Sequence, residues 1–366
     1  MRHRQAVCSI VPPHILHRLA ESDDEGLRKD ARDAIALTER LRGERAFAGG
    51  LPSGVSPGMK RRTVYDARNG TGLPGMLVRS EDGPATDDAS VERAFRGAGD
   101  TYDFFRVAYG RNSVDDRGLR LDSSVHYAVR FDNAFWNGRQ MVYGDGDGII
   151  FRDFTSCPDV IGHELTHGVT DYEANLVYYG QPGALNESMS DVFGILVKQW
   201  RLSHTAAAAD WLVGEGLFAP GVAGAALRSM KAPGTAYDDP RLGKDPQPAH
   251  MRDFVTTSDD DGGVHINSGI PNHAFYLAAV DIGGWAWERS GAIWYDALTG
   301  YLRAQATFED AAAATIAAAG ARFGRRSLEE QAVRAAWQRV GVASDAPLAR
   351  RGLEVARSKT LRADSL

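Results

Sequence analysis

The stretch "GHELTHGVTDYEANLVYYGQPGALNESMSD", residues 162–191, gathers histidines and carboxylates in one short part of the chain. Its first part, "HELTH", separates His163 and His167 by four positions. On a helix, residues at this spacing lie about 40° apart around the axis and about 6 Å apart along it, so both imidazoles can reach one ion. Zinc suits two imidazoles and a carboxylate, with a fourth position left to water. The spacing therefore favours a zinc site.

Glu164 is the candidate general base of this site. It is rotated away from the line of the two histidines, so it cannot bind the same ion, but it can hold the water and accept its proton. The alternative is an ordinary amphipathic helix whose histidines are only packed or solvated. A third ligand would decide between the two, and "NESMSD", residues 186–191, supplies Glu187 and Asp191 on one face of the next helix.

The two carboxylates have different expected roles. Glu187 would complete the zinc ligands, whereas Asp191 would hydrogen-bond the far nitrogen of a ligand histidine and so fix its tautomer. Asn186 is a second candidate for such support. For Asp191 the alternative is a carboxylate in the first turn of a helix, where the helix dipole favours negative charge.

Composition argues against two classes of protein. The chain has 366 residues, of which 43% are hydrophobic and 25% charged, with a net charge of -6 and no basic stripe. We therefore expect a soluble protein of two packed lobes without a nucleic-acid partner. The longest apolar stretch, residues 273–291, is interrupted by Asp281 and two glycines, well short of the roughly 20 apolar residues that a membrane span needs.

The N-terminus predicts no secretory signal peptide. Its apolar run is short and is ended by Pro12 and Pro13, so synthesis in the cytoplasm is the default expectation. Secretion by a signal-independent route stays open. The chain has two cysteines, Cys8 and Cys157, which could form at most one disulfide and only in an oxidising compartment, and we do not expect that bridge.

The texture of the sequence changes along the chain. Residues 14–47 predict one or two charged helices with a break at Gly26, followed by a linker rich in Gly, Pro and Ser. Strand signals dominate from residue 63 to about 148, apart from a helix near 89–108. Beyond Ser156 the pattern predicts helices over 157–178, 186–200, 271–287, 291–304, 307–320 and 327–339.

Five motifs resemble those of a single enzyme family. They are "NAFWNGRQMVYGDGDG" (133–148), "DVIGHELTHGVTDYEANLVY" (159–178), "GALNESMSD" (183–191), "ALRSM" (226–230) and "DDDGGVHINSGIPN" (259–272). Together they resemble the thermolysin family of zinc peptidases, specifically its protealysin-like branch, from about residue 60 to 343. The resemblance implies an α+β fold with a β-rich N-terminal lobe, a mainly helical C-terminal lobe and the active-site helix between them. It also implies zinc held by His163, His167 and Glu187, with Glu164 as general base.

The resemblance assigns roles that spacing alone does not reach. His265 resembles the histidine that stabilises the oxyanion, Asp260 the carboxylate that orients it, and Tyr178 the tyrosine that shares the oxyanion. Taken alone, His265 would be interpreted as a core histidine. The matched substrate contacts are Asn133 and the backbone of Ala134, which hold the substrate main chain, and Arg228, which donates to a substrate carbonyl.

An apolar pocket is implied for the residue that follows the scissile bond. The residues matched to it are Phe151, Phe154, Val160, Val213 and Leu227. Such a pocket implies cleavage before Leu, Phe, Ile or Val. Specificity should be broad, because a pocket of this kind discriminates by only about 1 to 3 kcal/mol per methylene.

The chain departs from the larger members of the family at their calcium site. The matching positions hold Asp159, Asp210 and Glu215, but Leu212 and Lys198 stand where glutamates would be. A lysine cannot bind calcium, so we expect the Lys198 ammonium to replace the ion, which makes calcium binding doubtful. The alternative is that Lys198 points to solvent.

The N-terminal unit resembles the short propeptide of the branch, which is marked by a proline pair, here Pro12 and Pro13 in "CSIVPPHIL" (8–16). Two interpretations of Cys8 stay open. Its thiolate could take the place of the water on zinc and silence the enzyme. Alternatively, Cys8 is a small buried apolar residue and the proline turn alone blocks the site.

We therefore expect the precursor of a monomeric zinc endopeptidase that acts on peptides or proteins, with its own propeptide as intramolecular inhibitor. The alternative is a latent zinc-bound binding module that is never processed, and a zinc esterase or amidase fits the peptide clamp less well. The expected units are a propeptide-like segment with its linker (1–52), a β-rich lobe including the HELTH helix (53–178), a helical lobe (179–345) and a C-terminal tail (346–366). Processing is expected within residues 44–58.

Overall fold

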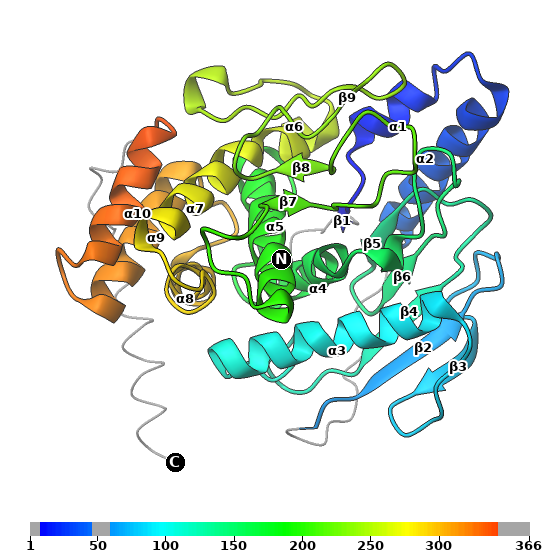
Figure 1. Cartoon of the computed structure of the whole chain (residues 1–366), viewed down its shortest axis with the longest axis horizontal. Coiled ribbons are helices and arrows are strands. Elements are labelled where there is room, and N and C mark those ends of the chain that lie inside the picture. The colour runs from blue at the N-terminus through cyan, green and yellow to red at the C-terminus, as the bar shows by residue number, and fades with distance from the viewer. Residues whose placement is uncertain (1–7, 46–58, 343–366) are drawn as a thin grey trace.

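A six-stranded mixed sheet and a group of helices form the two sides of the molecule (Figure 1). The computed structural model describes residues 8–45 and 59–342. The sheet has the order β1-β5-β6-β4-β2-β3, with β2, β4 and β6 parallel to one another and the other neighbours antiparallel. Its strands are β1 Cys8–Ser9, β2 Arg62–Asp66, β3 Met76–Ser80, β4 Leu121–Val125, β5 Ala134–Trp136 and β6 Met141–Tyr143.

The remaining elements are mainly helical. Two short antiparallel ribbons pair β7 Leu212–Val213 with β8 Arg228–Ser229, and β9 Asp238–Asp239 with β10 Gly243–Lys244. The helices are α1 Pro13–Leu19, α2 Glu25–Arg45, α3 Ala89–Tyr109, α4 Pro158–Tyr172, α5 Gly180–Leu202, α6 Asp260–Asn267, α7 Gly269–Ile282, α8 Ser290–Asp296, α9 Phe308–Phe323 and α10 Leu328–Arg339, with short turns at Phe154–Ser156, Met251–Asp253 and Ala297–Tyr301. Among the described residues, no helix has both the length and the apolar character of a membrane span.

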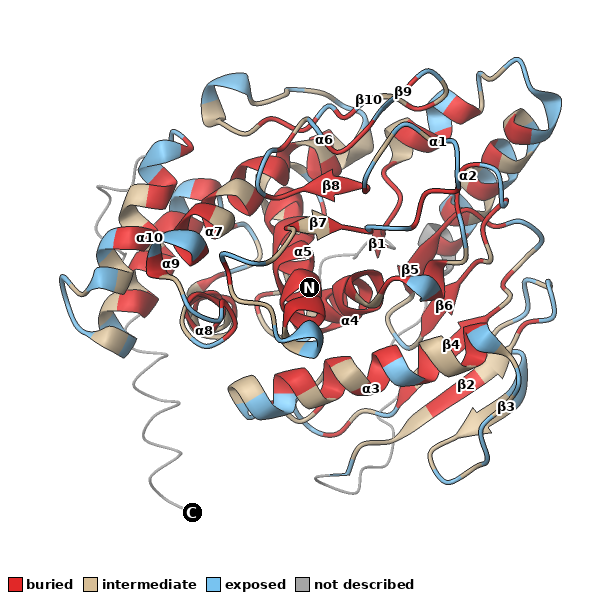
Figure 2. Ribbon diagram, viewed as in Figure 1, coloured by how far each residue is buried: buried red, intermediate tan, exposed pale blue. Residues whose placement is uncertain are grey.

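Helices α4 and α5 lie between the two sides and are buried along most of their length (Figure 2). Two glycines let them approach closely. A Cβ on Gly194 would stand 2.5 Å from the Asp159 carbonyl oxygen, and one on Gly162 would stand 3.1 Å from the Gly194 Cα. Since real side chains do not tolerate the first of these distances, glycine is required where the helices meet. This close contact brings the histidines of α4 to the carboxylates of α5.

The N-terminal strand joins the sheet edge next to α4. β1 pairs with β5, with Cys8 opposite Trp136 and Ser9 opposite Phe135. After Pro12 the chain turns into α1, which packs on α2. The N-terminal unit is thus anchored to the sheet through backbone pairing over the helix that carries "HELTH".

The predicted α+β fold class is confirmed, but several predicted boundaries are wrong. The break in the N-terminal helices falls at residues 20–24 rather than at Gly26. The Asp24 carboxylate accepts hydrogen bonds from the backbone N–H groups of Gly26 (2.8 Å) and Leu27 (3.1 Å) and so caps α2. Gly26 lies inside the first turn, where this cap outweighs its low helix propensity.

The helices around the candidate site also differ from the prediction. The predicted helix 157–178 ends at Tyr172, so Tyr178 lies in the connection that follows, and the next helix begins at Gly180 rather than at residue 186. The predicted helix 291–304 ends at Asp296 and continues as a π-helical turn. Strand β5 lies inside the region where strands were predicted, but its own position was not predicted, because its three residues are all buried and show no alternation.

Some expectations about the chain stay predictions. The division at residues 52, 178 and 345 is untested, and the tail 346–366 lies outside the described residues, as does most of the predicted processing segment 44–58. Within the described part of the chain, Cys8 and Cys157 are both buried and neither forms a disulfide. The Cys157 thiol instead donates to the Glu215 carbonyl oxygen at 3.3 Å.

Candidate metal centre and catalytic site

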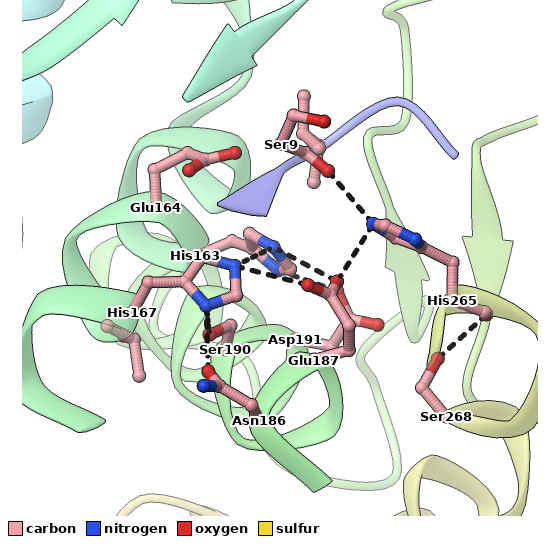
Figure 3. A network of polar contacts seen from close by, with 12 residues as sticks. Ser9, His163, Glu164, His167, Asn186, Glu187, Ser190, Asp191, His265 and Ser268 are labelled. Carbon is pink, nitrogen blue, oxygen red and sulfur yellow. Dashed lines mark hydrogen bonds and ion pairs between the residues drawn. The ribbon is translucent and has the colours of Figure 1, made fainter. Parts of the chain in front are cut away.

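Helix α4 carries His163, Glu164 and His167, which are all fully buried, and its two histidines face the polar side chains of α5 (Figure 3). Each histidine is held through its Nδ1 atom. His163 Nδ1 lies 2.8 Å from Asp191 Oδ1, and His167 Nδ1 lies 2.8 Å from Asn186 Oδ1. Because both partners are acceptors, each Nδ1 can donate to its partner, and in this tautomer the ring offers its Nε2 lone pair to another group.

The two Nε2 atoms and the Glu187 carboxylate form a triangle. The Nε2 atoms are 3.0 Å apart, Glu187 Oε1 is 3.4 Å from His167 Nε2, and Glu187 Oε2 is 3.5 Å from His163 Nε2. A tetrahedral zinc site with bonds of about 2.0 to 2.1 Å has ligand atoms roughly 3.3 Å apart. Glu187 Oε2 is buried and has no hydrogen-bond partner among the described residues. The three side chains therefore fit a divalent cation.

Asp191 connects the site to distant parts of the chain. Arg228 Nε lies 2.8 Å from Asp191 Oδ2 and Arg228 Nη2 lies 2.8 Å from Oδ1, while Asn272 Nδ2 donates to Oδ2 at 2.8 Å. Burial works against the charge on Asp191, but Arg228 and His163 outweigh it and lower its pKa. Sequence reasoning missed Asn272, because no local spacing links it to a residue 81 positions earlier.

Glu164 faces the N-terminal strand rather than α5. Its Oε2 accepts a hydrogen bond from the Trp136 backbone N–H at 2.9 Å, and its Oε1 is buried without a hydrogen-bond partner among the described residues. Burial raises the pKa of Glu164, and the charge on Glu187 raises it further, whereas the backbone N–H groups of Trp136 and Ile10 lower it. A buried carboxylate with a raised pKa suits a general base that must hold and release a proton.

His265 approaches from α6 on the opposite side. The turn before it has positive φ at Asp260 (53°), Gly262 (83°) and Gly263 (77°), which the two glycines adopt without strain. This turn returns the Asp260 carboxylate to the ring, with Oδ1 2.5 Å from His265 Nδ1. Burial would lower the pKa of His265, but the Glu187 and Asp260 carboxylates outweigh it and raise the pKa to about 9. His265 is therefore a cationic donor.

The Tyr178 hydroxyl contacts both Glu187 and His265. It donates to Glu187 Oε1 and is 3.3 Å from His265 Nε2. Burial raises the pKa of Tyr178, and the charge on Glu187 adds to this effect. The phenol is thus kept protonated, as a hydrogen-bond donor must be.

The N-terminal strand occupies the contacts that the sequence assigned to substrate. Ile10 N–H donates to the Ala134 carbonyl oxygen at 3.1 Å, and Val11 N–H donates to Asn133 Oδ1 at 3.1 Å. Arg228 Nη1 donates to the Ile10 carbonyl oxygen at 3.1 Å. On the other side, His265 Nε2 lies 3.0 Å from the Ser9 carbonyl oxygen (Figure 3). Sequence reasoning did not foresee these backbone contacts.

The residues predicted to line the apolar pocket are all buried in the core around β7, β8 and the start of α4. They are Phe151, Phe154, Val160, Val213 and Leu227. The rings of Phe151 and Phe154 lie 5.7 Å apart, and Leu227 N–H donates to the Val213 carbonyl oxygen at 3.0 Å. Their role as a substrate pocket stays a prediction.

Lys198 lies among carboxylates on the far side of α5. Its Nζ is 2.8 Å from Asp210 Oδ2 and 2.9 Å from Glu215 Oε2, and it donates to the Leu212 carbonyl oxygen at 3.3 Å. Burial would lower the pKa of Lys198, but Asp159 and these partners raise it. The ammonium therefore stays charged and points into the protein rather than into solvent.

Comparison with known proteins agrees with this geometry. Residues 57–171 match the model of the thermolysin metallopeptidase catalytic domain, and residues 174–342 match that of the thermolysin metallopeptidase alpha-helical domain. An extracellular metalloprotease of Pectobacterium carotovorum is 48% identical over 337 residues, which cover 92% of this chain and 96% of the relative. A thermolysin of Alicyclobacillus acidocaldarius is 43% identical over 288 residues, covering 76% of this chain and 50% of the relative.

A solved structure is also similar over nearly the whole chain. The precursor of protealysin, a metalloproteinase from Serratia proteamaculans, superposes with a TM-score of 0.85 at 51% sequence identity. The likeness covers 92% of this chain and all of that one, 100%. The similarity thus includes the N-terminal unit as well as both lobes.

Proposed function

This chain belongs to the thermolysin family of metallopeptidases, and from this premise we propose that it is the precursor of a zinc endopeptidase that binds one catalytic zinc ion through His163, His167 and Glu187. The observation that carries the proposal is the buried triangle of two Nε2 atoms and one carboxylate, with both Nδ1 atoms held by acceptors. Zinc, when bound there, would supply a Lewis acid that lowers the pKa of water and polarises the substrate carbonyl.

The side chains of this protein would perform the proton transfers and the charge stabilisation. Glu164 accepts the proton of the attacking water and passes it to the leaving nitrogen. His265 and Tyr178 donate hydrogen bonds to the oxyanion that develops on the carbonyl oxygen, and Asp260 keeps the His265 ring oriented and charged. Asp191 and Asn186 fix the ligand histidines.

We further propose that the N-terminal segment is an intramolecular inhibitor bound in the manner of a substrate. Its backbone contacts Asn133, Ala134 and Arg228, which are the residues expected to hold a peptide main chain. In this arrangement the Ser9–Ile10 bond takes the position of the bond to be cut, because the Ser9 carbonyl faces His265 and the Ile10 nitrogen lies on the side of Glu164.

The fully buried Ile10 side chain supports an apolar preference after the scissile bond. The substrates would be peptides and proteins with Leu, Phe, Ile or Val at that position. Specificity should be broad, because one methylene changes the discrimination by only about 1 to 3 kcal/mol.

Hydrolysis of casein or a peptide by the processed protein tests this function. Activity should require removal of the N-terminal unit and should be abolished by a chelator and restored by zinc. A processed chain that is folded, carries zinc and hydrolyses neither substrate would favour the binding-module alternative.

Replacing Ile10 with Asp should weaken the latency of the precursor. Burying an isoleucine side chain contributes about 1.5 to 3 kcal/mol. Its loss should therefore increase the fraction of molecules whose N-terminal segment has left the site by a factor of about 10 or more. The measurement is the initial rate of hydrolysis of a short peptide by the full-length chain, before its mass changes. His17→Asp, on the exposed face of α1, is the matched control. An initial rate equal to that of the parent would argue against the inhibitory role.

We propose that Lys198 replaces calcium, so that Lys198→Ala should destabilise the protein and make it respond to calcium. The substitution leaves Asp159 buried without its counter-charge, which should lower the free energy of unfolding by about 1 to 3 kcal/mol. Calcium, which binds carboxylate and carbonyl oxygens, should recover part of this loss in the variant only.

Thermal unfolding with and without calcium measures this effect. Lys29→Ala is the control, because Lys29 forms an exposed ion pair with Asp33 at 3.0 Å, and its loss should cost less than about 1 kcal/mol. Tight stoichiometric calcium binding by the parent protein would contradict the replacement.

We also propose that the protein acts outside the cell as a monomer without nucleic-acid partners. A similar protein is named an extracellular metalloprotease, and the net charge of -6 disfavours nucleic acid. Detection of the processed chain in culture medium, and its mass in solution, would test these points.

A further inference from the structure

The Ser9–Ile10 peptide bond of the N-terminal segment lies among the residues proposed to bind and cut a substrate. His265 Nε2 lies 3.0 Å from the Ser9 carbonyl oxygen, and the Ile10 N–H and C=O are bound by Ala134 and Arg228. Glu164 and the triangle of ligand atoms are complete. If the proposed peptidase function is correct, this bond is an intramolecular substrate, so a latent precursor needs something beyond steric blockage to protect it.

Cys8 lies one residue before this bond and next to the ligand atoms. It is 2% exposed and packs against Tyr178 and Val264. Cys8 Sγ, one ring nitrogen of His167 and one carboxylate oxygen of Glu187 all lie within 4.8 Å of one another. The sulfur thus lies where it can reach the ion that the histidines and Glu187 would hold.

Two further groups point to a cation at the same place. Glu187 Oε2 and Glu164 Oε1 are both buried and lack a hydrogen-bond partner among the described residues. His163 Nε2 and His167 Nε2 lie 3.0 Å apart, and with the proton of each ring on Nδ1 both nitrogens would offer a lone pair to a positive ion between them. Cys8 therefore lies beside the three side chains that are proposed to bind zinc.

We propose that Cys8 is the fourth zinc ligand of the precursor. The thiol would lose its proton to solvent as the sulfur–zinc bond forms, because the thiolate is the form that binds metal. Two neutral imidazoles, one carboxylate and one thiolate balance the two positive charges of zinc, which favours the ion in a buried site. Four protein ligands also convert a catalytic site into a closed one, since catalytic zinc keeps a position open for water.

This ligation would explain why the strand inhibits instead of being cut. With Cys8 in the fourth position, Glu164 has no water to activate beside the Ser9 carbonyl. Removal of the N-terminal unit would break the sulfur–zinc bond and let water take the vacated position. Cys8 and the Ser9–Ile10 bond that it would protect are adjacent in sequence. Release of Cys8 from zinc would therefore expose this bond to hydrolysis.

Zinc K-edge X-ray absorption of the full-length chain tests the ligation directly. The Glu164→Gln background keeps the precursor intact during the measurement. We expect a sulfur neighbour at about 2.3 Å in this protein and in its Cys157→Ser version, in which the other buried cysteine is removed. In the Cys8→Ala version only nitrogen and oxygen neighbours should remain. If zinc bound to the full-length Glu164→Gln protein, with Cys8 present, has only nitrogen and oxygen neighbours, the proposal is overturned.

The protecting role is tested with Glu164 intact. The Cys8→Ala precursor should hydrolyse its own Ser9–Ile10 peptide bond. Water adds to the Ser9 carbonyl carbon and the C–N bond breaks, which gives a carboxylate on Ser9 and an amine on Ile10. Intact mass measurement should therefore find a new chain that begins at Ile10, whereas the parent and Cys157→Ser should not give it. A Cys8→Ala precursor that stays uncut at this bond and as latent as the parent would overturn the protecting role.

These outcomes are separable from failure of the proposed function. A full-length chain that binds no zinc, together with a processed chain that hydrolyses no peptide, would refute the peptidase itself. An active processed enzyme whose precursor has no sulfur neighbour on zinc would refute only the Cys8 ligation.

Discussion

Replacing Glu164 with Gln should lower kcat for peptide hydrolysis by a factor on the order of 10² to 10⁴ while leaving the zinc content unchanged. Gln keeps the shape of the side chain and can still accept the hydrogen bond that the Trp136 backbone N–H donates to Glu164 Oε2. What it lacks is the capacity to accept the proton of water and return it to the leaving nitrogen. KM should change little, because Glu164 is proposed to act on the proton rather than on the substrate main chain.

The comparison must be made on processed protein, since the variant should not process itself. Both chains are therefore cut in trans by an added protease, and kcat, KM and bound zinc are measured. Glu309→Gln is the matched control, because Glu309 is exposed at the start of α9 and should leave all three unchanged. A Glu164→Gln enzyme with a large fraction of the parental kcat would place the base elsewhere.

The parts of the site that the sequence predicted are those encoded by local spacing. His163 with His167, and Glu187 with Asp191, are pairs four residues apart, so a helix alone brings each pair to one face. That the two faces meet depends on Gly162 and Gly194, whose role appears only when the helices are packed. The change of pattern near residue 156 predicted strands before it and helices after it, whereas the α+β fold class was implied by the family resemblance.

The missed parts depend on contacts between distant residues. Asn272 reaches Asp191 across 81 positions, and the Trp136 N–H reaches Glu164 from a strand too short to show alternation. Arg228 was assigned only through the family resemblance, since no spacing connects it to α5. The misplaced break at Gly26 has a different cause, because the Asp24 cap competes with glycine and wins.

Replacing Asp191 with Asn should be the most destabilising single change proposed for the site. Asp191 accepts hydrogen bonds from His163, from two nitrogens of Arg228 and from Asn272. An amide has one acceptor oxygen, so its NH₂ group must face one of these donors. Arg228, which is 1% exposed, would then be left with an incompletely neutralised charge. Removing one partner of such a buried pair costs about 3 to 5 kcal/mol.

The effect on zinc should be visible separately from the effect on folding. Without the carboxylate behind it, His163 loses both the fixed tautomer and part of its basicity, so zinc affinity should fall by a factor of about 10 to 100. Urea unfolding of the zinc-free protein measures the first effect, and competition with a chelator of known affinity measures the second.

Asp296→Asn is a matched control for Asp191→Asn, because Asp296 also forms a two-fold pair with an arginine, at 2.7 Å and 2.9 Å to Arg322. That pair is exposed, with 42% and 31% of the two side chains accessible, so its loss should cost less than about 1 kcal/mol. Both carboxylates pair two-fold with an arginine, so the difference between the variants reports the burial of Asp191 together with the hydrogen bonds that it also accepts from His163 and Asn272. Equal costs would mean that Asp191 contributes no more than a surface ion pair, and the proposal that it anchors His163 to the site would then fail.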